Sequence, residues 1–237
     1  MRRTIVGPGD AEALPQPVHR YFERALPEGQ RRIAWARVQQ RGSFLVRAPG
    51  RWRQFRATQT FTTRPPGFVW DARIRLLAGV PILVRDSFHE GAGSMRATLL
   101  GFRLADTAGT PAIATAALQR YLAEAALLPT ALLPSAGVSW TPIDASSARA
   151  SLAAGTTRVS LEFRFGGDGL VESVYAPARM RDVKGQGVAT PWLGRWWDYE
   201  EQDGLLAPRR GEVEWLLPQG PRPYWRGEIT RIEYELG

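Results

Sequence analysis

Apolar side chains recur at every second position in parts of this chain. Between residues 67 and 76, Phe68, Trp70, Ala72, Ile74 and Leu76 share one face, and Asp71, Arg73 and Arg75 lie on the other. Residues 157–165 repeat the pattern. A period of two is that of a β-strand with one buried and one solvated face. Further strands are predicted at 31–41, 51–62, 81–89, 94–104, 145–153, 170–176, 178–183, 195–202, 210–217 and 223–236.

Helical spacing replaces this alternation in two places. Near the N-terminus, Leu14, Val18, Tyr21, Phe22 and Ala25 predict a helix that Pro27 stops. A central helix is predicted from residue 112 to about 128.

The central helix begins with Thr110 as its N-cap and Pro111 as its first residue. Arg120 and Glu124 are four residues apart, which predicts an ion pair on the surface of the helix. The apolar stretch 125–133 follows, and prolines interrupt and bound it. It is interpreted either as a mobile lid over an apolar cavity or as a fixed plug, because periodicity does not separate the two.

The order of elements predicts the fold class. A helix, about five strands, a helical segment and about six strands follow one another through short connections, which favours antiparallel meanders. No βαβ alternation is present, which argues against a doubly wound nucleotide-binding fold. We expect an α+β, mainly β chain, with a curved, half-barrel-like antiparallel sheet wrapped around the central helical segment. Residues 1–237 are expected to form a single domain, with 1–16 as a loose N-terminal arm.

Composition excludes several kinds of chemistry. The chain of 237 residues has no cysteine, and its histidines are His19 and His89. Disulfides, thiolate metal sites and multi-histidine metal centres are therefore impossible. No apolar run approaches the length of a membrane-spanning helix. No cofactor and no metal are predicted. Nine tryptophans are present, and this residue lines ligand sites and interfaces as often as it fills cores.

Charge is unevenly distributed. Between Arg31 and Arg64 there are nine arginines and no acidic residue. We interpret this segment as a solvated sheet face, with binding to an anionic membrane or nucleic acid as the alternative. Nucleic acid is the less favoured partner, whereas peripheral membrane contact stays open. The N-terminus has no apolar leader segment, so the chain as given is expected in the cytoplasm; an exported or longer parent protein is the alternative.

Several short motifs resemble a bacterial family of proteins of unknown function. They are found at residues 67–72, 93–95, 120–124, 129–134, 140 and 224–230. The resemblance extends from about residue 30 to the C-terminus. The order of the predicted elements is also similar to the half-barrel of lipoprotein carriers such as LolA. That similarity implies a curved sheet around an apolar hollow, with the helical segment as its plug or lid.

Candidate catalytic motifs are weak. Asp86, His89 and Glu90 are close in sequence, but strand periodicity puts His89 on the face opposite the carboxylates, so no metal site is predicted. The glycines of 166–169 form a hairpin turn and lack the residues of a phosphate-binding loop. No nucleophile elbow is present. A non-enzymatic role is therefore favoured over catalysis.

Segment 191–203 combines tryptophans, a tyrosine and four carboxylates. Trp192, Trp196 and Trp197 are candidate platforms for a sugar ring or a cationic group. Strand geometry would place Trp197, Tyr199 and Glu201 on one face and Trp196, Asp198 and Glu200 on the other. A carbohydrate-active enzyme or a sugar binder is the alternative function.

The favoured function is binding of a hydrophobic or amphipathic, lipid-like small molecule in the hollow of the sheet. The predicted wall residues are Trp70, Met95, Tyr121, Phe163 and Trp196. Arg73, Arg179 or Arg181 is expected to meet an anionic headgroup at the rim.

Overall fold

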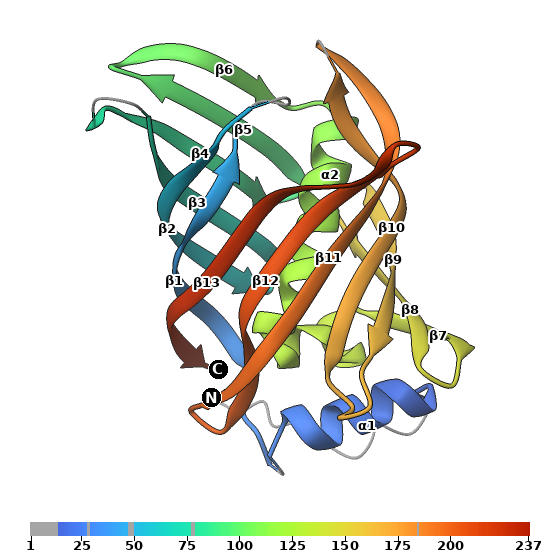
Figure 1. The fold of residues 1–237 in the computed structure, drawn as a ribbon. Coiled ribbons are helices and arrows are strands. Elements are labelled where there is room, and N and C mark those ends of the chain that lie inside the picture. The colour runs from blue at the N-terminus through green and yellow to red at the C-terminus, as the bar shows by residue number, and fades with distance from the viewer. Residues whose placement is uncertain (1–13, 28, 47–49, 77–78, 184) are drawn as a thin grey trace.

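The strands and helices of a computed structural model follow the predicted order (Figure 1). The structure describes residues 14–27, 29–46, 50–76, 79–183 and 185–237. The first half contains α1 (Gln16–Ala25), β1 (Ile33–Leu45), β2 (Trp52–Thr63), β3 (Pro66–Arg75), β4 (Pro81–His89), β5 (Ala92–Leu99) and β6 (Phe102–Ala108). Next come α2 (Pro111–Glu124) and the 3₁₀ turns η3 (Ala125–Leu127), η4 (Pro129–Leu132) and η5 (Pro134–Ala136). The second half contains β7 (Ser139–Asp144), β8 (Ser147–Ala154), β9 (Thr157–Phe165), β10 (Val171–Val183), β11 (Gln186–Gln202), β12 (Leu205–Leu217) and β13 (Gly220–Leu236).

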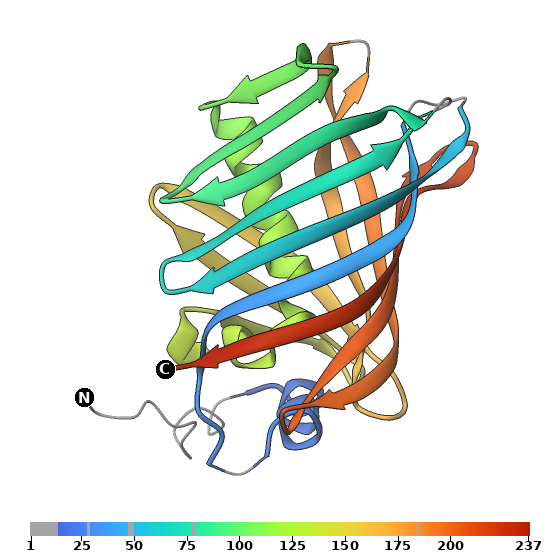
Figure 2. The same ribbon diagram turned by 90° about the vertical axis from the view of Figure 1, so that its left-hand side faces the viewer.

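The described strands form one antiparallel sheet of 13 strands. Its order is two meanders, β6 to β1 and β13 to β7, joined where β1 pairs with β13. The first and last strands of the chain thus lie at the centre of the sheet, and β6 and β7 end the order. Figure 2 shows β1 to β6 side by side, with α2 behind them.

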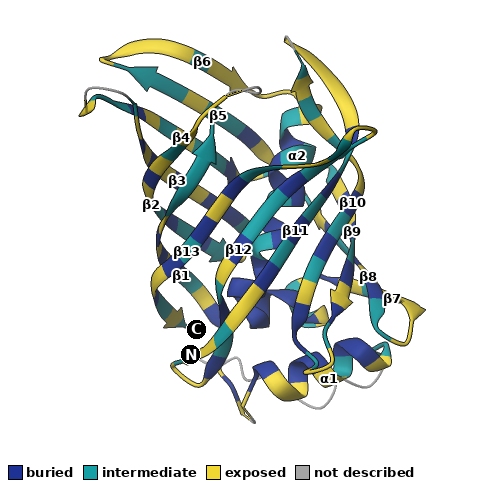
Figure 3. Cartoon of the chain, in the orientation of Figure 1, coloured by how far each residue is buried: buried dark blue, intermediate teal, exposed yellow. Residues whose placement is uncertain are grey.

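The central helix crosses the inner face of this sheet because it connects the two end strands. The Thr110 hydroxyl accepts a hydrogen bond from the Ile113 amide at 3.3 Å, which caps the first turn of α2. The helix contacts β3, β4 and β5 of one meander and β9 and β10 of the other. Leu118 and Leu122 are fully buried. Figure 3 shows α2 coloured mainly as buried or intermediate.

Side chains of the sheet anchor the segment that follows α2. Trp196 Nε1 donates to the Ala123 carbonyl, Tyr234 Oη to that of Leu127 and Trp140 Nε1 to that of Leu132. These carbonyls lie at the C-terminal end of a helix and in 3₁₀ turns, where backbone acceptors need such partners. The stretch 125–133 is buried throughout.

The fold class is confirmed: α+β and mainly β, with a curved antiparallel sheet around a central helical segment. Some element boundaries were predicted wrongly. The strand expected at 94–104 is β5 and β6, because Leu100 and Gly101 turn the chain with φ of 51° and 82°. The strands expected at 170–176 and 178–183 are the continuous strand β10. The helix expected to reach about 128 ends at Glu124 and continues as 3₁₀ turns.

Two further expectations concern the N-terminal arm and membrane-spanning helices. Residues 1–13 of the predicted arm lie outside the described residues. In the described ranges, no helix combines the length and the apolar character needed to cross a membrane.

Candidate functional site

A cavity of about 430 Å³ lies between α2 and the inner face of the sheet. Tryptophan side chains form much of its wall: Trp70, Trp192, Trp196 and Trp225. Other apolar wall residues are Phe44, Val46, Ile74, Ile82, Val84, Met95, Leu104 and Val213. Small-molecule sites commonly have a volume in this range, an apolar wall and a few polar groups.

The aromatic rings lie flat on the sheet because glycines are beneath them. Trp196 is the cross-strand partner of Gly211, and a Cβ added to Gly211 would be 2.6 Å from the Trp196 ring. A Cβ on Gly194 would be 2.9 Å from the ring of Trp192. Without side chains at these positions, the rings fold down against the backbone and the space above them stays open.

A line of glycines across the sheet extends this arrangement. Gly211 pairs with Gly227 on β13, and Gly227 pairs with Gly42 on β1. The ring of Trp225 covers Gly227, where an added Cβ would overlap it. The central strands therefore give the cavity a floor of backbone and flat aromatic rings.

Charged side chains meet at one wall of the cavity. Arg120 of α2 is 2.6 Å from Asp86 Oδ2 and 2.9 Å from Glu124 Oε1. Its guanidinium also lies 4.9 Å from the centroid of the Trp70 ring, a cation–π distance. Burial on its own lowers the pKa of Arg120, but the two carboxylates outweigh burial, and its pKa is raised. Arg120 therefore stays charged and holds both carboxylates.

A chain of hydrogen bonds continues from this cluster into the sheet. Gln59 is fully buried and donates to Glu124 Oε2 at 2.6 Å. Gln40 donates to Gln59 at 3.0 Å and accepts from Trp70 Nε1 at 2.9 Å. The orientation of the Trp70 ring in the cavity wall is thereby fixed.

Arg179 is the second cation of the cavity wall. Its guanidinium lies 5.0 Å from the centroid of the Trp192 ring. Burial lowers its pKa. Tyr224, another wall residue, accepts a hydrogen bond from Trp192 Nε1 at 2.9 Å.

The structure brings part of the predicted site together. Trp70, Met95, Arg179, Trp192 and Trp196 all line the cavity.

The remaining predicted site residues lie elsewhere. Tyr121 and Phe163 are buried among other aromatic rings, with Tyr121 6.3 Å from Phe61 and Phe163 5.2 Å from Trp140 between centroids. Arg73 lies on the outer face of the sheet. Arg181 is 3.4 Å from the hydroxyl of Thr190, and Trp197 is exposed.

Sequence reasoning missed several wall residues, including Phe44, Tyr224 and Trp225. It also placed the Arg120–Glu124 pair on the protein surface, which is wrong, since both side chains are less than one-fifth exposed. The i,i+4 spacing correctly predicted that Arg120 and Glu124 form an ion pair, but it did not predict which side of the helix carries the pair.

The acidic residues of segment 191–203 do not face one another across a cleft. Asp198 pairs with Arg210 at 3.3 Å, and Glu200 pairs with Arg209 at 3.1 Å. The predicted shared face of Trp197 and Tyr199 is wrong. Asp198 has a φ of 56°, and after it Tyr199 turns inward and donates to the Val171 carbonyl, while Trp197 points to solvent.

The arginine-rich segment contributes to an open groove on the outer face of the sheet, which Arg41, Arg56 and Arg73 line. Arg41 pairs with Glu228 at 2.7 Å. Asp86 and His89 do not form a site together. Asp86 pairs with Arg120 at the cavity wall, whereas His89 is exposed beside Glu90. Across the residues that the structure describes, no group of three histidines or carboxylates could hold a metal ion.

A family model described as "Family of unknown function (DUF6920)" matches residues 12–234. None of the curated proteins compared with the chain matches it.

Solved structures align with most of the chain at low identity. One is a putative outer membrane lipoprotein-sorting protein domain from Vibrio parahaemolyticus, at 8% identity, 86% coverage of each chain and a TM-score of 0.46. A LolA superfamily protein from Nitrosomonas europaea aligns at 10% identity, 92% coverage of each chain and a TM-score of 0.42. A DUF1329 family protein from Desulfovibrio piger aligns at 13% identity, with 86% of this chain and 87% of that chain covered and a TM-score of 0.44.

Proposed function

The chain belongs to the DUF6920 family of unknown function, and from its cavity we propose that it binds an amphipathic small molecule without catalysing a reaction. The apolar part of the ligand would lie on the tryptophan rings between α2 and the sheet. Membership of the family brings no activity with it, so the proposal depends on the cavity itself.

One observation carries this proposal: a mainly apolar cavity of about 430 Å³ between α2 and the inner face of the sheet. Protein interiors contain few voids larger than a water molecule. A void of this size leaves apolar wall atoms without partners, and a ligand of matching shape would supply them. The wall also carries Arg120 and Arg179, so a ligand with both an apolar body and a polar end fits it better than a hydrocarbon.

The described carboxylates of the cavity wall, Asp86 and Glu124, are already bonded to other side chains, which supports binding rather than chemistry. Arg120 holds the carboxylates of Asp86 and Glu124, and Gln59 donates to Glu124 as well. A general base or nucleophile needs an oxygen or nitrogen that is available to the substrate.

The test uses the tryptophans in the cavity wall as reporters. Dibromostearate and dibromostearyl alcohol carry bromine atoms that quench tryptophan fluorescence at close contact. We expect saturable quenching of the purified protein by at least one of them. Organic extraction followed by mass spectrometry of the same preparation identifies any bound amphiphile.

A pair of matched variants locates the binding. Ala105→Trp fills the cavity, because Ala105 lines it, whereas Ala108 lies on the same strand, β6, and is exposed. We expect Ala105→Trp to abolish quenching and Ala108→Trp to leave it unchanged. Absence of quenching in the unmodified protein, or equal quenching in both variants, would refute the proposal.

A further inference from the structure

A β-bulge in β10 turns Arg179 toward the cavity. Ala176 is paired with Trp192 on β11, but Arg179 is paired with Thr190, so β10 carries one extra residue between the two pairs. Regular alternation after Val174 and Ala176, both buried, would put Ala178 on the inner face and Arg179 on the outer face. The bulge reverses this, as bulges do when they redirect a side chain.

The bulge is anchored to the central helix. Gln119 of α2 donates to the Ala178 carbonyl at 3.2 Å. Pro177 lies within the bulge, where a strand tolerates a residue that cannot donate a backbone hydrogen bond. The position of Arg179 is therefore held by α2 and not left to a loop.

The guanidinium that the bulge brings inward lacks a partner for one of its nitrogens. Arg179 Nη1 is shielded from solvent, and within the described part of the chain no group accepts a hydrogen bond from it. No ion pair to Arg179 is present there either. A buried donor without an acceptor is costly and calls for an explanation.

Other charges at the cavity have partners. Asp86 and Glu124 are both bonded to Arg120, so these three side chains satisfy one another. Tyr224 accepts from Trp192. Among the described wall residues, Arg179 is thus the charged one with a buried nitrogen, Nη1, that has no acceptor, and its neighbour on one side is the face of the Trp192 ring.

We propose that Arg179 binds the acidic headgroup of the ligand, and that the ligand is an amphiphile ending in a carboxylate or a phosphate monoester. Guanidinium groups pair with both anions through parallel hydrogen bonds. The tryptophan-lined cavity would hold the alkyl part. This inference rests on the proposed function and specifies the class of ligand for the same site.

The test compares headgroups on one alkyl chain. Stearate, stearyl phosphate, stearyl alcohol and stearylamine compete with a bromine-labelled quencher, and inorganic phosphate is tested alone. We expect the two acids to bind about tenfold to a hundredfold more tightly than the alcohol, as hydrogen bonds to a charged group allow. Tightest binding by the amine, or competition by inorganic phosphate as strong as by stearyl phosphate, would overturn the inference.

Variants assign the preference to Arg179. Arg179→Gln should bring the acids to the affinity of the alcohol and leave the alcohol unchanged, and Arg179→Lys should restore part of the difference. Arg181→Gln is the matched control, because Arg181 follows the same bulge but contacts Thr190 and does not line the cavity. If Arg179→Gln keeps the preference for acids, Arg179 is not the headgroup residue. If no alkyl compound binds, including the alcohol, the proposed function fails as well.

Discussion

Arg120 Nη1 lies 2.6 Å from Asp86 Oδ2, and this ion pair ties the central helix to β4 at the cavity wall. The same guanidinium holds Glu124, one turn further along α2. The helix is thereby fixed in rotation, with the charged side chains at the cavity and the leucines in the core.

Removal of the Arg120 guanidinium should destabilise the protein strongly. Arg120→Met leaves two poorly solvated carboxylates without their cation, which costs about 3 kcal/mol of unfolding free energy. Urea denaturation measures the change. The triple variant Arg120→Met, Asp86→Asn, Glu124→Gln should recover most of it, since no charge is then left unpaired.

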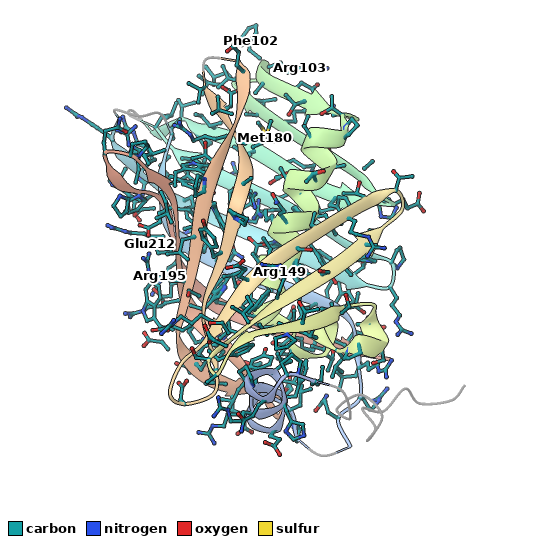
Figure 4. The ribbon with its side chains drawn as sticks, turned by 90° about the vertical axis from the view of Figure 1, so that its right-hand side faces the viewer. Phe102, Arg103, Arg149, Met180, Arg195 and Glu212 are labelled. Atoms are coloured by element: carbon teal, nitrogen blue, oxygen red, sulfur yellow. The ribbon has the colours of Figure 1, made fainter. Side chains whose placement is uncertain are left out.

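A surface pair provides the control for this experiment. Arg149, on β8 (Figure 4), is 2.9 Å from Glu162, and the Arg149 side chain is half exposed. Arg149→Met should cost less than about 1 kcal/mol. Equal losses for Arg120→Met and Arg149→Met would show that the cluster at the cavity is as well solvated as the surface.

The glycine beneath Trp225 should be needed for an open cavity. Gly227→Ala places a methyl group where the Trp225 ring lies, so the ring must move into the cavity. We expect weaker quenching by dibromostearate and a loss of about 1–3 kcal/mol in stability from overpacking. In Gly167→Ala the new methyl group meets no atom within 4 Å, so both measurements should match the unmodified protein. Unchanged binding in Gly227→Ala would show that this glycine and the Trp225 ring above it do not shape the ligand site.

Two buried tyrosines should respond in opposite ways to the loss of their hydroxyls. Tyr21 is fully buried, and its hydroxyl has no hydrogen-bond partner among the described residues. Burial raises its pKa, in keeping with an apolar setting. Tyr21→Phe should therefore raise the unfolding free energy by about 1 kcal/mol.

Tyr234→Phe is the counterpart, because the Tyr234 hydroxyl donates to the Leu127 carbonyl at 2.8 Å. Its removal should lower the unfolding free energy by about 1 kcal/mol. Chemical denaturation of the two variants, measured in parallel, shows whether each substitution raises or lowers the unfolding free energy. A loss of stability in Tyr21→Phe would mean that the Tyr21 hydroxyl has a partner, such as a buried water.

The sequence predicts the fold well where its pattern is local. Alternation at 67–76 and 157–165 identifies β3 and β9, and Thr110 with Pro111 marks the start of α2. The pairing of β1 with β13 is not visible in this way, because it joins residues at opposite ends of the chain. The turn at Leu100 and Gly101 was missed, because glycine is common in turns but leucine is not.

The site is harder to predict because it depends on exceptions to the pattern. Trp70 and Trp196 follow from alternation, but the flat rings depend on cross-strand glycines such as Gly211. Arg179 reaches the inner face through a bulge whose sequence signal is limited to Pro177. Departures of this kind from regular alternation are expected at functional sites.

If Arg179 serves a ligand, its replacement should stabilise the empty protein. Its Nη1 donor is buried without a partner, and burial lowers its pKa, so the folded state disfavours the charge. Arg179→Met keeps an apolar stem on the Trp192 ring and should raise the unfolding free energy by about 1 kcal/mol.

The opposite result is expected once ligand is present. A saturating acid stabilises the unmodified protein in proportion to its affinity, whereas Arg179→Met loses much of that gain. Thermal unfolding with and without stearate measures both effects, and Arg181→Met serves as the control. A residue retained for structure would lower stability when replaced, with or without stearate. Replacing a residue retained for binding does not lower the stability of the empty protein. The stability of the variant falls below that of the unmodified protein only when stearate is added.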